Sequence, residues 1–140
     1  MQPRYLLSII LLSIAAAACA PKPPAVAKAG GASPAAEAGQ RIYNGNCLPC
    51  HQATGGGIPG VYPSLSGSPV VNGDPAELAR WVLKGQRPLS MPSGRYSTQM
   101  LQFGWMKPAD AAALFTYVRS SFSNSAPPVD AATVTQALAQ

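Results

Sequence analysis

The five residues Cys47-Leu48-Pro49-Cys50-His51 decide the fold of this chain of 140 residues. Two cysteines that are separated by two residues and followed at once by a histidine form the attachment signature of a c-type haem. The spacing lets one turn of backbone bring both sulfurs to the two vinyl groups of a haem, and the next side chain then directs its imidazole at the iron. We therefore expect Cys47 and Cys50 to bind one haem c covalently, with His51 as an axial ligand of its iron.

Two other kinds of site use the same residue types. A thioredoxin-like redox dithiol needs a βαβ context, and the Gly/Pro-rich stretch after the motif does not offer one. A closed zinc site needs a fourth ligand, but His51 is the single histidine and the third cysteine, Cys19, lies in an apolar N-terminal segment. Both alternatives are therefore weaker than haem.

The composition limits the chain to one small domain. There are 15 prolines and 13 glycines, and 11% of the residues are charged, so a multi-domain enzyme is excluded. The formal net charge is +5, but the basic residues are scattered singly and are not interleaved with aromatic residues. We therefore expect no nucleic acid among its partners.

The N-terminal segment has the pattern of an export signal. Arg4 supplies the positive charge, residues 6–14 are apolar, and residues 15–20 are small. The apolar run ends at residue 20 after 15 residues, which is short of the roughly 20 that a spanning helix needs. We expect a periplasmic protein.

Cys19 gives this signal two possible processing sites. Ala18-Cys19-Ala20 fits an ordinary signal peptidase, whereas Ala16-Ala17-Ala18-Cys19 resembles a bacterial lipobox whose cysteine becomes lipidated. The Pro/Ala/Gly-rich stretch that follows would suit a lipid-anchored domain as its flexible tether. The expected organisation is a signal at residues 1–19, a tether at 20–36, a haem domain at 37–128 and a C-terminal tail at 129–140.

The periodicity of the haem domain predicts an all-α fold with three main helices. The first covers residues 35–46; the second begins after the N-cap Asp74 and ends at Lys84, with Gly85 as C-cap; the third begins at Pro108 and carries Phe122 on its apolar face. A small hairpin is expected about Ser93-Gly94, and residues 130–138 could form one further short helix. Three helices bury little apolar surface by themselves, so the haem is expected to complete the core.

Several motifs together resemble a class I monohaem cytochrome c over residues 35–128. They are Gly39-x-x-x-Tyr43, the Cys47–His51 motif, Tyr62-Pro63-Ser64-Leu65-Ser66-Gly67, Asn72-Gly73-Asp74-Pro75, Met100-Leu101-Gln102-Phe103-Gly104-Trp105 and Leu114-Phe115-Thr116-Tyr117-Val118-Arg119. Within that class the chain is most similar to small c-type haem domains that are subunits or partners of periplasmic alcohol, aldehyde and sugar dehydrogenases. It departs from the class pattern at Met100-Leu101, where Met-Pro is usual, and at Lys107-Pro108, where a Ser/Thr-Asp helix start is usual.

The resemblance implies roles for further residues. Gly39 should let the first helix approach the last one against Tyr117. The Pro63 carbonyl should accept a hydrogen bond from Nδ1–H of His51, which fixes the tautomer of a ligating histidine. Leu65 should pack on the haem ring and contribute to the cofactor-binding site.

The sixth iron ligand is expected to be a methionine. A thioether opposite a histidine raises the reduction potential, which suits an electron carrier. We take Met100, in its Met-x-x-Phe-Gly context, as this ligand. Met91, which Pro92 follows, is the second choice, and Met106 or an open site are further alternatives.

The resulting interpretation is an electron carrier without catalytic residues or an organic substrate. The carboxylates lie singly in the sequence, so no acid–base pair is evident; they are Glu37, Asp74, Glu77, Asp110 and Asp130. The expected partners are a dehydrogenase, an oxidase or a respiratory complex, with the membrane as a further partner if Cys19 is lipidated. A small haem peroxidase, a gas-binding haem protein and a lipid-anchored subunit without a carrier role are alternatives. Trp81, Trp105 and Arg95 could reach the haem propionates, or could be ordinary packing residues and a solvated charge.

Overall fold

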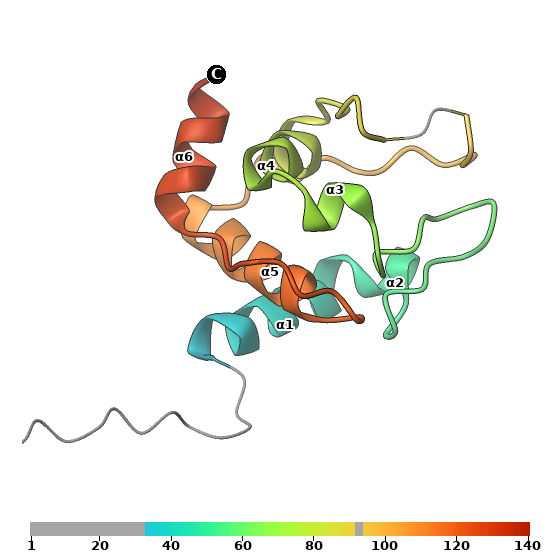
Figure 1. Ribbon diagram of the computed structural model, residues 1–140, viewed down its shortest axis with the longest axis horizontal. Helices are drawn as coiled ribbons and strands as arrows, with labels where there is room; N and C mark the ends of the chain where they lie inside the picture. The colour runs from blue at the N-terminus through green and yellow to red at the C-terminus, as the bar shows by residue number, and fades with distance from the viewer. Residues whose placement is uncertain (1–32, 92–93) are drawn as a thin grey trace, which may run out of the picture.

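The computed structural model describes residues 33–91 and 94–140, which form helices joined by long loops (Figure 1). The helices are α1 (Pro34–Asn46), α2 (Leu48–His51), α3 (Pro69–Asn72), α4 (Pro75–Lys84), α5 (Pro108–Ser120) and α6 (Ala131–Ala139). Within the described ranges the β-type pairing is limited to one isolated bridge between Ile58 and Tyr62. The all-α prediction is therefore confirmed.

The longer helices begin where the sequence supplies a cap or a proline. The side chains of Ser33, Asp74 and Asp130 each accept a hydrogen bond from a backbone N–H in the first turn of α1, α4 and α6. Lys107 precedes α5 and makes no such bond, so Pro108 alone fixes the backbone for that start. The predicted starts of α4 and α5 are both confirmed.

Helices α1 and α5 cross in close contact at Gly39. A Cβ atom at this position would overlap the Ala113 carbonyl oxygen and lie 2.7 Å from the Cβ atom of Tyr117. The ring of Tyr117 packs beside that of Tyr43 from α1, with the centroids 5.5 Å apart. The predicted approach of the two helices at Gly39 is therefore present.

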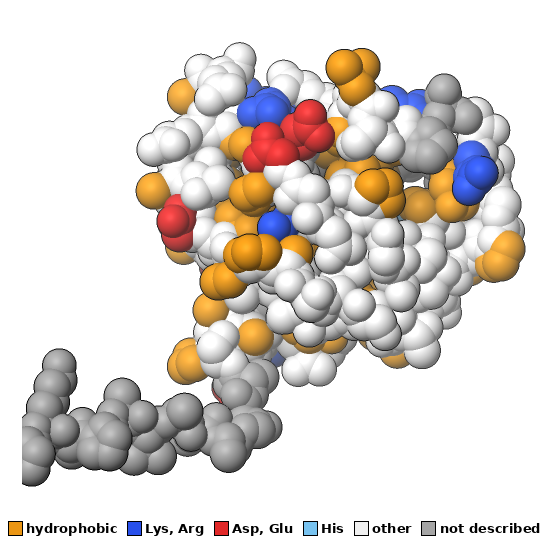
Figure 2. All heavy atoms as spheres, viewed as in Figure 1, with side chains coloured by type: hydrophobic (Ala, Val, Ile, Leu, Met, Phe, Trp, Pro, Cys, Tyr) orange, Lys and Arg blue, Asp and Glu red, His pale blue; other side chains and the backbone are white. Residues whose placement is uncertain are grey.

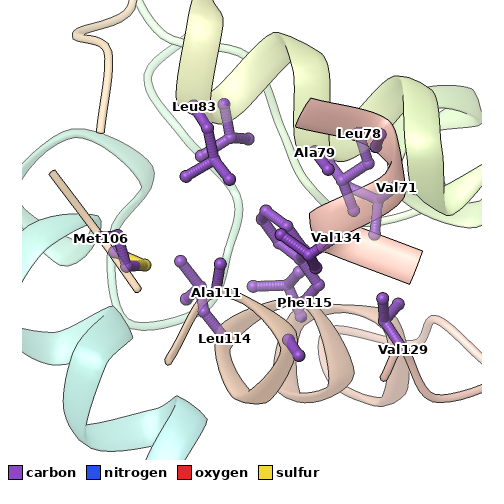
Figure 3. Close-up of a cluster of buried hydrophobic side chains, with 14 of the residues drawn as sticks. Val71, Leu78, Ala79, Leu83, Met106, Ala111, Leu114, Phe115, Val129 and Val134 are labelled. Carbon is purple, nitrogen blue, oxygen red and sulfur yellow. The ribbon is translucent and has the colours of Figure 1, made fainter. Parts of the chain in front are cut away.

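The apolar core lies between α4, α5 and α6 (Figure 3). Phe115 of α5 and Val134 of α6 are fully buried at its centre, and Leu83 of α4 and Met106 lie at its margin. Tyr43 of α1, which is fully buried, and Val70 and Val71 of α3 belong to the same cluster. The core thus also includes side chains from α1 and α3, and α1 packs along α5 (Figure 1).

The C-terminal residues correct one prediction. Residues 129–140 are not a tail outside the packed domain, because α6 packs on α4 and α5 and buries Val134 and Ala137. The Nζ atom of Lys84 also donates a 2.6 Å hydrogen bond to the Leu138 carbonyl near the end of α6. The short helix considered for residues 130–138 is observed as α6, so the described residues contain four helices of nine or more residues where three main helices were expected.

The end of α5 corrects another prediction. The helix stops at Ser120, and Phe122 has a positive φ of 57° in the turn that follows. Its ring folds back onto Tyr43, with the centroids 5.1 Å apart. Phe122 therefore packs on α1 from a turn rather than from the apolar face of a helix.

The expected signal, the lipobox at Cys19, most of the tether and Ser93 of the expected hairpin lie outside the described residues. Where residues are described, no helix has the length and apolar character needed to cross a membrane.

Candidate functional site

Both cysteines and the histidine of the motif lie within one helical turn. The N–H of Cys47 donates to the Tyr43 carbonyl at the end of α1, over 2.8 Å, and the N–H of His51 donates to the Cys47 carbonyl over 2.9 Å. These bonds continue the helical path from α1 into α2. Cys47, Cys50 and His51 consequently all line the same cavity.

The two cysteines are half-buried and are not joined to each other. Burial, together with the neighbouring Cys50, raises the pKa of the Cys47 thiol to about 11. Before a haem is attached, the Cys47 thiol is therefore neutral at physiological pH, and its residue lines the cavity.

His51 is held in one tautomer by the loop opposite. Its Nδ1 atom lies 3.0 Å from the Pro63 carbonyl oxygen, as predicted, and a carbonyl can only accept, so Nδ1 carries the proton and Nε2 keeps its lone pair. The pKa of His51 is lowered because burial disfavours the imidazolium, although the bond to Pro63 opposes this effect. The ring is therefore a neutral imidazole with one nitrogen free to bind a metal.

The loop that carries Pro63 is tied to the end of α2. The N–H of Gly57 donates to the His51 carbonyl over 3.0 Å, and a Cβ atom on Gly57 would lie 2.5 Å from the Pro63 carbonyl oxygen. Gly57 also has a φ of 65°, so its lack of a side chain is required twice. The loop passes so close to His51 only because glycine occupies this position.

The cavity has a volume of about 680 Å³, which is within the usual range for ligand and cofactor sites. A smaller apolar hollow of about 40 Å³ is also lined by Cys47, His51 and Met100. Leu65, predicted to pack on the haem, lines this hollow together with His51. The cavity thus has the two thiols and the imidazole on one wall, and an apolar recess next to them.

Three methionines occupy different places relative to the cavity. Met100 lines both the cavity and the hollow and packs against the core. Met91 also packs against the core and lines the cavity, but it does not line the hollow. Met106 is a core residue that is 5% exposed. The geometry thus keeps Met100 and Met91 as candidate ligands and places Met106 in the packing.

The charged and aromatic residues of the rim differ in part from the expectation. Trp81 and Arg95 line the cavity, as does Arg87, which sequence reasoning did not single out. Trp105 does not line it and is 69% exposed, in contact with Phe103. The described lining contains no Asp or Glu, and the acidic side chains visible in Figure 2 all lie on the left half of that face.

These features fit a haem. Its two vinyl groups require two thiols one turn apart, its iron requires a neutral imidazole, and its two propionates are anions that suit an arginine-bearing rim. The structure gives no support to the alternative of a zinc site. In residues 33–91 and 94–140, no group of three His, Cys, Asp or Glu side chains is placed to hold a metal ion.

One supporting contact was missed at the sequence level. The hydroxyl of Tyr43 donates a 2.6 Å hydrogen bond to the carbonyl of Gln52, the residue after His51. Gln52 has a φ of 64° and a ψ of 164°, a region that is nearly restricted to glycine. Backbone strain thus lies next to the histidine, and no residue type in the sequence signals it.

Comparison with known families identifies a match. The family model for cytochrome c matches residues 36–122, which is more than half of the chain. Comparison with curated proteins finds no match. The matched region contains the Cys47–His51 motif and the cavity that it lines, so the chain belongs to the cytochrome c family and binds haem c covalently.

Proposed function

We propose that the protein is a single-haem electron carrier in which His51 and Met100 are the axial ligands of the iron. The observation that carries this proposal is that Cys47, Cys50, His51 and Met100 border one cavity. When bound, haem c supplies one-electron redox chemistry at its iron. The family membership supports electron transfer in general, and the ligand assignment is the part that needs a test.

Each proposed residue has a distinct task. His51 presents Nε2 because the Pro63 carbonyl holds the proton on Nδ1. The Met100 thioether favours the reduced state and so raises the reduction potential. Leu65 and the apolar hollow around it exclude water from the histidine side. Arg87 and Arg95 offset the charge of the propionates at the rim.

The alternative of a peroxidase or a gas-binding protein requires an open distal position and a distal acid–base group. The described cavity lining contains no histidine besides His51 and no carboxylate. No observation therefore favours this alternative over an electron carrier.

The ligand assignment is tested with the paired variants Met100→Ala and Met91→Ala. We expect Met100→Ala to abolish the thioether-to-iron charge-transfer band of the oxidised protein and to lower the reduction potential by on the order of 100 mV, within the range that axial ligands control. Met91→Ala should retain the band. The opposite result would assign the ligand to Met91, and retention of the band in both variants would contradict methionine ligation from this cavity.

For location and partners, we propose an exported carrier that exchanges electrons with a periplasmic or membrane-bound dehydrogenase and is anchored through a lipid on Cys19. The support is the signal-like sequence, the proline-rich residues that follow it and the dehydrogenase-subunit resemblance. Expression of the full precursor with Cys19→Ala should move the haem protein from the membrane fraction to the soluble periplasmic fraction. A wild-type protein that is already soluble would exclude the anchor.

A further inference from the structure

The turn after α5, Phe122-Ser123-Asn124, has an unusual backbone. Phe122 and Ser123 both have positive φ values, 57° and 64°, which are uncommon for residues other than glycine and are a clear outlier for a bulky aromatic residue. Such a conformation persists where surrounding contacts fix it. We call these three residues the Asn124 turn and ask which contacts fix it.

The side chain of Asn124 uses its full hydrogen-bonding capacity. Its Nδ2 group donates to the carbonyls of Leu65, over 3.1 Å, and Val118, over 2.9 Å. Its Oδ1 atom accepts from the Gly67 N–H and from Nδ2 of Asn72, each over 2.9 Å. An amide offers two donors and two acceptor lone pairs, so the buried side chain leaves none of them unused.

Two of these four bonds go to the loop after Pro63. The carbonyl of Leu65 and the N–H of Gly67 are held by one side chain that lies 57 residues from Gly67 in the sequence. This loop segment has no helix or strand of its own. Asn124 therefore holds the backbone of this segment at two points.

Phe122 contacts the loop between α2 and α3 at a second point. A Cβ atom on Gly55 would overlap the Phe122 ring and lie 2.6 Å from its Cδ2 atom, so the two residues are in close contact. The Gly55 carbonyl in turn accepts a 2.7 Å hydrogen bond from the N–H of Leu65. The Asn124 turn thus contacts both backbone segments that meet at Leu65.

Pro63 lies two residues before Leu65, and its carbonyl oxygen is 3.0 Å from Nδ1 of His51. We propose that Asn124 is a positioning residue for His51, because it fixes the Leu65 backbone and thereby holds the Pro63 carbonyl at Nδ1–H. This rests on the proposed role of His51 as an axial ligand. A partner that accepts this hydrogen bond raises the basicity of the imidazole, so Asn124 would contribute to the reduction potential without touching the haem.

The sign of the effect follows from the charge on the iron. A more basic imidazole stabilises ferric iron more than ferrous iron, which lowers the reduction potential. Loss of Asn124 loosens the loop and lengthens the bond from His51 to Pro63. The potential should therefore rise, and the Nδ1 proton should be less strongly hydrogen-bonded.

The experiment compares Asn124→Ala with Thr116→Val in the haem-loaded protein. Thr116 is a matched control: it is also buried and also bonds to a backbone carbonyl, that of Val129, over 3.2 Å, but it has no bond to the Pro63 loop. The readouts are the midpoint potential, the free energy of unfolding and the proton NMR signal of Nδ1–H in the reduced protein. Because the chain has 1 histidine, this signal needs no assignment among several.

For Asn124→Ala we expect a higher midpoint potential, an upfield shift of the Nδ1–H signal and faster exchange of that proton with solvent. Thr116→Val should lower stability and leave potential and signal unchanged. If Asn124→Ala does not load haem, Asn124→Ser, which is neutral and too short to span both bonds to the loop, replaces it with the same expectation.

Unchanged potential and Nδ1–H in the Asn124 variant would overturn the proposal, as would equal shifts in the Thr116 control. A different failure would concern the proposed function itself. If the wild-type ring protons of His51 lack the large ring-current shifts of a haem ligand, His51 is not axial, and the inference falls with that assignment.

Discussion

Two glycines of α1 should respond in opposite directions to the same substitution. Gly39 lies at the crossing with α5, where a Cβ atom would be 2.7 Å from both the Ala113 carbonyl carbon and the Tyr117 Cβ atom. Gly45 lies six residues further along, is exposed, and has no atom within 4 Å of its would-be Cβ. Gly39→Ala and Gly45→Ala therefore differ in packing but not in helix propensity.

The magnitude follows from the required movement. Carbon atoms in contact are ordinarily about 3.5–4.0 Å apart, so Gly39→Ala must separate α1 and α5 by about 1 Å. Overpacking costs roughly 1–3 kcal/mol, and the upper end applies because a backbone carbonyl cannot swing aside. Replacing glycine by alanine in a helix returns about 1 kcal/mol. The net change is a loss of about 2 kcal/mol for Gly39→Ala and a gain of up to about 1 kcal/mol for Gly45→Ala.

The assay is thermal and denaturant unfolding of both haem-loaded variants beside the wild type. At roughly 4–8 °C per kcal/mol for a domain of this size, Gly39→Ala should lower the melting temperature by about 8–16 °C, whereas Gly45→Ala should raise it slightly. A Gly39→Ala protein as stable as the wild type would refute the close crossing. A loss for Gly45→Ala would refute the argument that space alone separates the two positions.

Further expectations concern backbone strain and capping. Gln52→Gly should raise the free energy of unfolding by about 1 kcal/mol, since it removes strain of roughly 1–3 kcal/mol and adds less entropy to the unfolded chain; Gln52→Ala keeps the Cβ atom and should show no gain in the same denaturant titration. Asp130→Ala should destabilise α6, because it removes the bond from the Thr133 N–H. That bond holds the pKa of Asp130 below its usual range. The stabilisation by the ionised Asp130 is therefore complete above the pKa of an ordinary aspartate, and it is lost as the pH falls through the lowered pKa of the folded protein. The difference in the free energy of unfolding between neutral and acid pH should therefore be larger for the wild type than for Asp130→Ala.

The sequence predicted those parts of the fold that depend on neighbouring residues. The start of α4 at Asp74-Pro75 and its end at Gly85, which has a φ of 71°, follow from capping chemistry that acts within one turn. The cysteine–histidine motif is equally local, because three backbone hydrogen bonds of the helical path from α1 into α2 position its side chains. Such features can be predicted from sequence because every interacting residue is only a few positions away.

Features that depend on distant partners were missed or left open. Residues 129–140 were expected as a tail because their apolar pattern is too short to predict a packed helix. Val134 is buried only because α4 and α5 form a surface against which α6 packs. Phe122 was placed on the helix since its spacing fits α5, but the contacts with Gly55 and Tyr43 that favour the turn come from other parts of the chain. Tertiary packing decided both cases.

The same distinction separates the two halves of the site. The thiols and the imidazole come from one turn, whereas Met100 is 49 residues from His51 and Asn124 is 73 residues from it. A methionine can at least be recognised as a candidate ligand by its sulfur. An asparagine that binds backbone carbonyls leaves no comparable signal, because every residue of the loop offers the same carbonyl group. Only the three-dimensional structure shows which of these carbonyls it binds. Residues that position a ligand are therefore the part of a haem site that is hardest to predict from sequence. They are identified from the hydrogen bonds that buried polar side chains make in the structure.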